Sequence, residues 1–123
     1  MEKMLSQEVK AGDLFYTSWG YDQTNYDYVM VLGLSASGKT AICQMAKAKV
    51  VGYSHQCYEQ EPQKETYGAI FRMRIKEGYR GDVCLRGSYP FCASGSMEST
   101  RLDTFYRVEE GRTYFETDSM FGH

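Results

Sequence analysis

The chain has 123 residues, the length of one ordinary domain, and its 42% hydrophobic and 24% charged residues are typical of a folded globular protein. Its formal net charge of −2 means that the protein as a whole has no positive field that would attract nucleic acid or anionic lipid. Binding of either therefore needs a local patch of basic residues. No run approaches the ~20 apolar residues that cross a bilayer, and residues 1–8 lack the apolar core of a signal peptide. We therefore expect a single domain, 1–123, in the cytoplasm.

Aromatic side chains make up 15% of the chain, including eleven tyrosines, and this composition favours strands. The clearest strand is 67–76, where apolar residues such as Phe71 and Met73 alternate with a mostly basic set. Such alternation indicates a strand with one face in solvent. Further strands are predicted at 14–19 and 26–32.

The second half of the chain contains one predicted hairpin and two predicted loops. Residues 101–108 and 112–117 are expected to pair, with Gly111 at the turn position that needs a positive φ. Residues 52–66 and 87–100 are polar and contain glycine and proline, so both are expected to be loops.

Residues 40–51 have no clear period, and a strand is favoured there over a helix. With that strand, the chain has five to seven short strands with turn signals about every ten residues. The predicted fold is therefore mostly β, a small SH3-like barrel or a curled antiparallel sheet with a C-terminal hairpin. A helix at about 40–50 makes the fold α+β, and this is the alternative.

Residues Gly33 to Thr40 match the phosphate-binding pattern G-x-x-x-x-G-K-[ST] and follow an apolar run, as such a loop does. In that interpretation backbone N–H groups hold phosphates at a helix N-terminus, Lys39 reaches the β and γ phosphates, and Thr40 holds magnesium. However, a phosphate-loop enzyme is built from repeated β-α-β units around a parallel sheet, and strands with one solvent-exposed face, as predicted in the second half of the chain, do not fit that architecture. In addition, no apolar strand that ends in an aspartate follows the motif, so magnesium would lack a second protein ligand. A hairpin turn is therefore favoured, and nucleotide binding is the third functional hypothesis.

The segment 18–28 concentrates aromatic, carboxylate and amide side chains in eleven residues. Loops of this composition bind ligands or partners, because aromatic rings offer flat faces and polar groups add specificity. The same groups also stabilise turns through their own backbone, and both interpretations stay open. The candidate binding residues are Trp19, Tyr21, Asp22, Gln23, Asn25 and Asp27.

A set of basic residues lies on one predicted strand face and the turn that follows it. Cations aligned beside aromatic loops are what a small barrel uses to bind single-stranded nucleic acid. A solvated outer face carries the same residue types, and this structural interpretation is favoured. The candidate nucleic-acid-binding residues are Arg72, Arg74, Lys76, Arg80 and Arg86.

The four cysteines are expected to be reduced thiols rather than disulfides or metal ligands. Cys57 lies two residues after His55, but no Cys-x2-Cys pair is present, and a structural zinc site usually supplies close ligand pairs. No serine nucleophile elbow occurs either. The sequence thus predicts no metal, no cofactor and no catalytic residues.

The residues from Gly12 to Tyr28 resemble a signature, G-D-[IL]-F-x-x-S-W-G-Y-D-Q-T-N, of uncharacterised small proteins from bacteriophages and mobile elements. The resemblance covers about twenty residues well and continues loosely into Ser37 to Thr40. It implies a mobile-element origin, and it carries no known activity.

Two functional classes stand above the rest. The first is an accessory protein that binds a host or phage protein partner, for example in host interaction or anti-defence. The alternative is a small β-barrel that binds nucleic acid. Binding to an oligonucleotide that weakens steeply with salt distinguishes the second class from the first.

Overall fold

The computed structural model describes residues 9–19, 25–54, 57–77, 82–91, 96–109 and 113–117, and strands dominate these ranges. The described residues include no helix, and therefore no helix long and apolar enough to span a membrane. The strands are β1 (Leu14–Trp19), β2 (Asn25–Leu34), β3 (Thr40–Ser54), β4 (Cys57–Glu77), β5 (Val83–Pro90), β6 (Thr100–Arg107) and β7 (Tyr114–Thr117).

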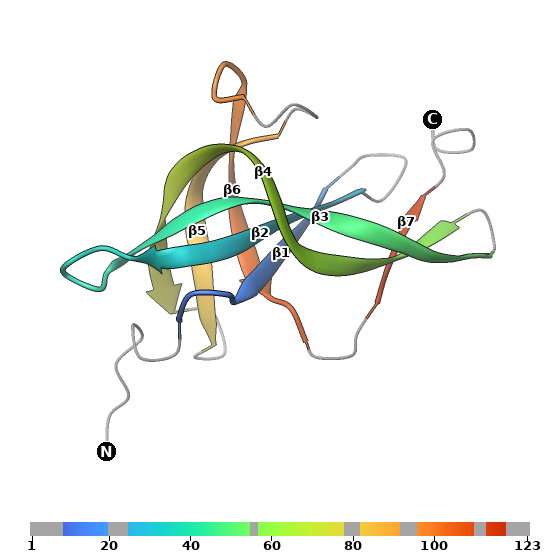
Figure 1. The fold of residues 1–123 in the computed structure, drawn as a ribbon, viewed down its shortest axis with the longest axis horizontal. Helices are drawn as coiled ribbons and strands as arrows, with labels where there is room; N and C mark the ends of the chain where they lie inside the picture. The colour runs from blue at the N-terminus through green and yellow to red at the C-terminus, as the bar shows by residue number, and fades with distance from the viewer. Residues whose placement is uncertain are drawn as a thin grey trace.

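The first six strands form a closed antiparallel barrel (Figure 1). Each strand pairs with the strands before and after it in the chain, and β6 pairs with β1 to complete the ring. Closure gives every strand of the ring a neighbour on both sides, which reduces the aggregation hazard of open sheet edges. The expected small, mostly β barrel is confirmed.

The alternative of a helix at about 40–50 is wrong, because these residues lie in β3. Ala41, Cys43 and Met45 point into the barrel and are buried, whereas Ile42 and Gln44 are partly exposed on the other face. The period of two was hard to see in the sequence because small inward residues alternate with an outward isoleucine.

The expected C-terminal hairpin does not form. β6 lies between β1 and β5, and β1 pairs with Tyr106 and Arg107, the end of β6 where the hairpin was expected to start. β7 instead pairs with the first residues of β4, Cys57–Gln60. Gly111, which was expected at the hairpin turn, lies outside the described residues.

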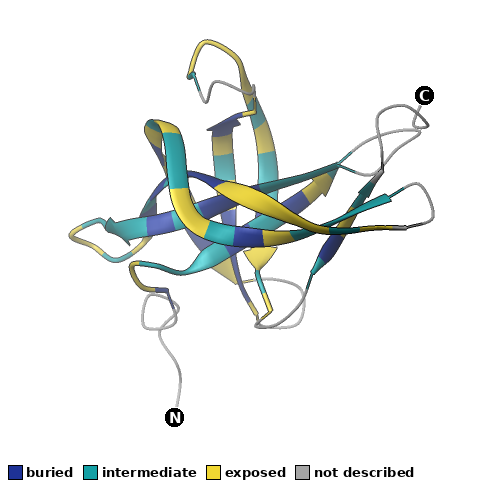
Figure 2. Cartoon of the chain, turned by 45° about the vertical axis from the view of Figure 1, so that its right-hand side comes forward, coloured by how far each residue is buried: buried dark blue, intermediate teal, exposed yellow. Residues whose placement is uncertain are grey.

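The barrel interior is filled by alternate residues of its six strands, as the pleat requires. Figure 2 shows buried and exposed stretches following one another along these strands. Burial in this core raises the pKa of the Cys43 thiol to about 12. The buried core residues are Val9, Phe15, Val29, Val31, Ala41, Cys43, Met45, Phe71, Met73, Ile75, Val83, Leu85, Tyr89 and Phe105.

The strands β3 and β4 are longer than the barrel and continue beyond it as a paired ribbon, residues 47–54 and 57–65, which we name the arm (Figure 1). The prediction of a loop at 52–66 was wrong, as was the loop at 87–90, which belongs to β5. Register shifts in β4 bend the ribbon where it leaves the barrel. Gly68 lies in the first of these shifts with a φ of 79°, a conformation that favours glycine.

The motif at 33–40 forms the turn between β2 and β3, as the hairpin interpretation predicted. Backbone N–H groups that a phosphate-binding loop would offer are used inside the turn. Gly38 N donates to Ser35 O at 2.9 Å, and Thr40 N lies 3.3 Å from Ser35 Oγ. Thr40 then begins a strand, where phosphate binding requires a helix. Nucleotide binding at this motif therefore lacks its structural basis.

This turn gives a direct test of the two interpretations. Gly38 has a φ of 75°, so Gly38→Ala is expected to lower the free energy of unfolding by about 1 to 2 kcal/mol. Lys39 is exposed, and Lys39→Ala is expected to change it by less than about 0.5 kcal/mol. Urea denaturation measures both. A rise in melting temperature with magnesium and ATP that Lys39→Ala abolishes would contradict the assignment of this segment as a turn.

Candidate functional site

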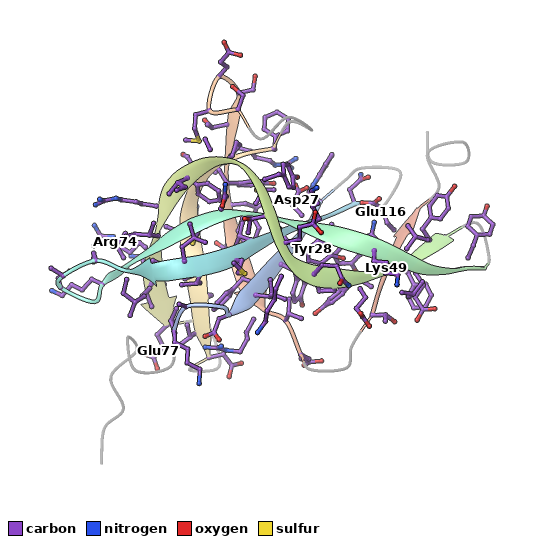
Figure 3. The ribbon with its side chains drawn as sticks, viewed as in Figure 1. Asp27, Tyr28, Lys49, Arg74, Glu77 and Glu116 are labelled. Atoms are coloured by element: carbon purple, nitrogen blue, oxygen red, sulfur yellow. The ribbon has the colours of Figure 1, made fainter. Side chains whose placement is uncertain are left out.

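One end of the barrel holds a half-buried carboxylate, Asp27, on the inward face of β2, and Figure 3 labels this residue. Trp19 Nε1 donates a hydrogen bond to Asp27 Oδ2 at 2.7 Å, and the Tyr89 hydroxyl donates to the same oxygen at 2.8 Å. Arg101 lies over the Trp19 ring, 4.8 Å from its centroid, and 3.9 Å from the carboxylate of Asp103. We name these five residues, Trp19, Asp27, Tyr89, Arg101 and Asp103, the barrel mouth.

The electrostatics of the barrel mouth follow from burial. Desolvation raises the pKa of Asp27, and the hydrogen bonds from Tyr89 and Trp19 offset part of that rise. Burial and the nearby Asp27 charge raise the pKa of Tyr89, which keeps its phenol protonated as a donor. Trp19, at the end of β1, is half-buried. Its bond to Asp27 ties β1 to β2, so these two candidate residues stabilise the fold.

The remaining residues of the aromatic segment are only partly described. Tyr21, Asp22 and Gln23 lie outside the described residues. Asn25 stands opposite Trp19 in the β1–β2 register, and its Nδ2 is buried with no hydrogen-bond partner within the described chain. The interpretation of this segment as a binding loop stays a prediction.

The predicted basic residues gather on the outer face of β4 and β5. Arg72, Arg74 and Lys76 are exposed and alternate with buried core residues of β4. Arg86 on β5 stands directly opposite Arg74 and donates a hydrogen bond to Thr104 Oγ1 at 2.6 Å. We name these four cations, Arg72, Arg74, Lys76 and Arg86, the basic face. Arg80 lies outside the described residues.

The basic face has no acidic counterpart in the described part of the chain. None of its four cations forms an ion pair there, although the protein is acidic as a whole. Like charges opposite each other on neighbouring strands destabilise a sheet by roughly 0.2 to 1 kcal/mol. The Arg74–Arg86 pair is therefore a feature that folding alone does not favour.

The arm exposes apolar side chains that the barrel does not cover. Val50, Val51 and Tyr53 of β3 are 54%, 46% and 51% exposed, and Phe115 of β7 is 47% exposed. Tyr53 packs against Tyr58 across the ribbon with ring centroids 4.9 Å apart. The last β2–β3 pair is Tyr28–Ala46, so beyond it no described strand pairs with this edge of β3.

A pocket of about 340 Å³ opens where the arm leaves the barrel. Its walls come from β2, β3, β4 and β7, because β3 separates from β2 after Ala46 and leaves a gap between the two strands. Figure 3 shows Tyr28 and Glu116 in this central region, away from Arg74. The lining residues are Tyr26, Asp27, Tyr28, Ala46, Lys47, Ala48, Gln60, Tyr67 and Glu116.

A chain of hydrogen bonds crosses the pocket. The Tyr28 hydroxyl donates to Gln60 Oε1 at 2.9 Å, and Gln60 Nε2 donates to Glu116 Oε1 at 3.1 Å. The backbone N–H of Tyr26 lies beyond the last β2–β3 pair and donates to Glu116 Oε2 at 3.0 Å. Glu116 thus supplies an acceptor that β3 no longer provides. Burial raises its pKa, and these two hydrogen bonds oppose that rise.

Tyrosine rings surround the inner end of this network. Tyr16, Tyr26 and Tyr28 pack around Tyr114 of β7, with ring centroids 4.7, 5.2 and 5.7 Å from it. These contacts bury Tyr114 on the outer side of β1 and β2 and fix β7 there. The packing holds Glu116, two residues later, in the gap between β2 and the arm.

The sequence predicted the basic face but missed the pocket. Tyr26 and Tyr28 flank the predicted Asp27 at a spacing that puts them on its opposite face, which was the one available signal. Gln60 and Glu116 are 56 positions apart, so no local pattern joins them. Cys43, Cys57 and Cys84 are free thiols, and the described residues contain no cluster of three metal-binding side chains. Cys92 and His55 lie outside the described residues.

Comparison of the chain with protein-family models, with curated proteins and with solved structures finds no significant match. The resemblance of Gly12 to Tyr28 to bacteriophage and mobile-element proteins stays a prediction. The candidate sites are thus the barrel mouth, the basic face and the arm with its pocket.

The half-buried Asp27, with its raised pKa, predicts a pH dependence of stability. Its folded-state pKa is raised, so the folded protein keeps this proton to a higher pH than the unfolded chain. Stability is therefore lost as the pH rises from about 4 through the folded pKa. Asp27→Asn is expected to make this loss smaller, and Tyr89→Phe, which removes a bond that lowers the pKa, to make it larger. Urea denaturation across this pH range measures both, and identical slopes in all three proteins would contradict the assignment.

Proposed function

We propose that this protein is a cytoplasmic accessory factor of bacteriophage or mobile-element type that binds a partner protein through its arm. The observation that carries the proposal is the edge of β3 at residues 47–52, with which no described strand pairs after β2 has separated from it. An unpaired strand edge offers a row of backbone donors and acceptors to an extended segment of another chain. The interaction is therefore β-strand addition.

The side chains of the arm support this mode of binding. Lys47 to Val51 are five consecutive exposed residues, so both faces of the ribbon reach solvent there. Exposed valine and tyrosine contribute little to the barrel core, but they provide the apolar and aromatic contacts on which interfaces depend. Lys49 disfavours indiscriminate pairing at this edge, because a second cationic strand is repelled. It favours a partner segment that carries acidic residues.

The proposal predicts that added charge at the edge abolishes partner binding without unfolding the barrel. A partner captured from the lysate of a host bacterium is purified, and its affinity for the parent protein and the double variant Val50→Lys/Val51→Lys is measured by calorimetry. We expect at least a tenfold weaker affinity, which corresponds to about 1.4 kcal/mol. Thermal unfolding checks that the fold is retained.

Ile70→Lys is the matched control, because Ile70 is 60% exposed on β4 and lies outside the arm. This variant is expected to bind as the parent does. Hydrogen exchange of residues 47–53 is expected to slow in the complex, as new backbone hydrogen bonds form. Unchanged exchange in this segment, together with equal affinity of all three proteins, would refute strand addition.

A second candidate function is the binding of single-stranded nucleic acid by the basic face. The opposed pair Arg74 and Arg86, with no ion pair in the described part of the chain, favours it, because phosphates supply the missing negative charge. Tyr106 is 51% exposed on the outer side of β6, which pairs with β5, and offers a ring on which a base can stack.

This second function predicts a salt-dependent affinity for an oligothymidylate of about 20 nucleotides. If four cations contact phosphates, the slope of log K against log salt is about −3, because each contact contributes about −0.7 on single strands. Arg74→Ser/Arg86→Ser is expected to halve that slope, and Lys49→Ser on the arm to leave it unchanged. Fluorescence anisotropy measures the slopes. Absence of binding at low salt would exclude this function.

A further inference from the structure

The pocket between the arm and the barrel has a charge pattern that neither proposed function uses. Among the described residues that line it, Asp27 and Glu116 are acidic and Lys47 is the only base. Lys47 Nζ lies 2.9 Å from Glu65 Oε2, so this lysine is neutralised by a carboxylate of the arm. Burial raises the pKa of Glu116, and the nearby Asp27 charge adds to that rise. A bound cation would offset this negative potential.

The direction of the hydrogen bonds leaves acceptors facing the pocket. Every donation in the network runs toward Glu116, from the Tyr28 hydroxyl through Gln60 and from the backbone N–H of Tyr26. Each carboxylate oxygen of Glu116 accepts one of these bonds and keeps a second lone pair, and the Tyr28 oxygen also has acceptor capacity. One amide hydrogen of Gln60 is the donor that remains in the network. A ligand rich in N–H donors fits this surplus of acceptors.

Aromatic rings form the walls beside these acceptors. Tyr26 and Tyr28 lie with nearly parallel rings, 6.3 Å between centroids and 11° between planes, and Tyr67 contributes a third ring from β4. The negative faces of such rings attract an ammonium group that lies within ~6 Å of the centroid. At about 340 Å³ the pocket is at the small end of the range for ligand sites, and it suits a single alkylammonium group.

We propose that this pocket binds an organic ammonium group, with Glu116 as its counter-ion and Tyr26, Tyr28 and Tyr67 as its aromatic walls. The group is a primary or methylated amine, carried by a small molecule or by a lysine side chain. Its methylene or methyl groups pack against the rings, and its N–H groups, where present, donate to Glu116. Lys47 and Ala48 belong both to this lining and to the arm edge, but the ammonium contacts proposed here use neither of these two residues, nor the basic face.

The test uses butylammonium chloride, tetramethylammonium chloride and the uncharged 1-butanol as probes. Binding to the full chain is followed by calorimetry and by shifts of the tyrosine ring signals in NMR spectra. We expect saturable binding of at least one ammonium probe and none of 1-butanol at equal concentration. A lysine amide and the free amine then distinguish a peptide source from a small-molecule source.

Three variants locate the site. Glu116→Gln keeps an oxygen for the Tyr26 N–H but removes the charge, and it is expected to weaken ammonium binding at least tenfold. Tyr67→Leu keeps apolar volume but removes a ring, and a loss of about threefold or more is expected. Glu61→Gln removes an exposed carboxylate of the arm that does not line the pocket, and it is expected to bind as the parent does.

The outcomes are decisive even if one variant is unstable, because circular dichroism identifies unfolded protein and Tyr67→Leu tests the site separately from Glu116→Gln. Equal binding of butylammonium and 1-butanol, or equal loss in Glu61→Gln and Glu116→Gln, would overturn the proposal. Failure of partner binding by Val50→Lys/Val51→Lys leaves this site unaffected, so the two proposals fail separately.

Discussion

The pairing of β3 with β4 closes the barrel, and the same pairing continues beyond the barrel as the arm. Within the ring, this ladder completes the sheet and encloses the core. Beyond Ala46 the same ladder continues without β2, and shifts of register around Gly68 bend it away. The bend creates the gap that the pocket occupies and the edge to which β7 is added. Glu116 then accepts the Tyr26 N–H that β3 no longer reaches, so the closing strands determine the position of every candidate site except the barrel mouth.

Strand β2 serves two sites through the alternation of its side chains. The Asp27 carboxylate accepts hydrogen bonds from Trp19 and Tyr89 at the barrel mouth, while Tyr26 and Tyr28 point to the opposite face, and all three residues contribute to the pocket lining. Asp27 stabilises the barrel, and the two tyrosines form aromatic walls of the pocket. This separation explains why the most conspicuous segment of the sequence is part scaffold and part site. It also places the candidate pocket beside the edge of β3 with which no described strand pairs.

The barrel strands were predictable where one face is exposed to solvent and the other is buried, as at 67–76. Apolar and polar residues then alternate with a clear period of two. Residues 40–51 were ambiguous because small inward side chains weaken that contrast. The arm was missed because both faces of 47–51 reach solvent, so its strands lack alternation and resemble a polar loop. The pocket was missed for a different reason. Gln60 and Glu116 come together only because β7 pairs with β4, and these two strands are far apart in the sequence.

The central claim is that the β3–β4 ladder extends beyond the barrel core that it helps to close. Native-state hydrogen exchange along β3, on both sides of the point where the arm leaves the barrel, tests this claim. Residues 41–46 face buried partners and are expected to exchange only through global unfolding. Residues 47–52 pair with β4 but with no other described strand, and they are expected to open with a free energy well below the global value while the barrel stays folded. Equal protection on both sides of Ala46 would show that the arm belongs to the cooperative core, and it would contradict this account.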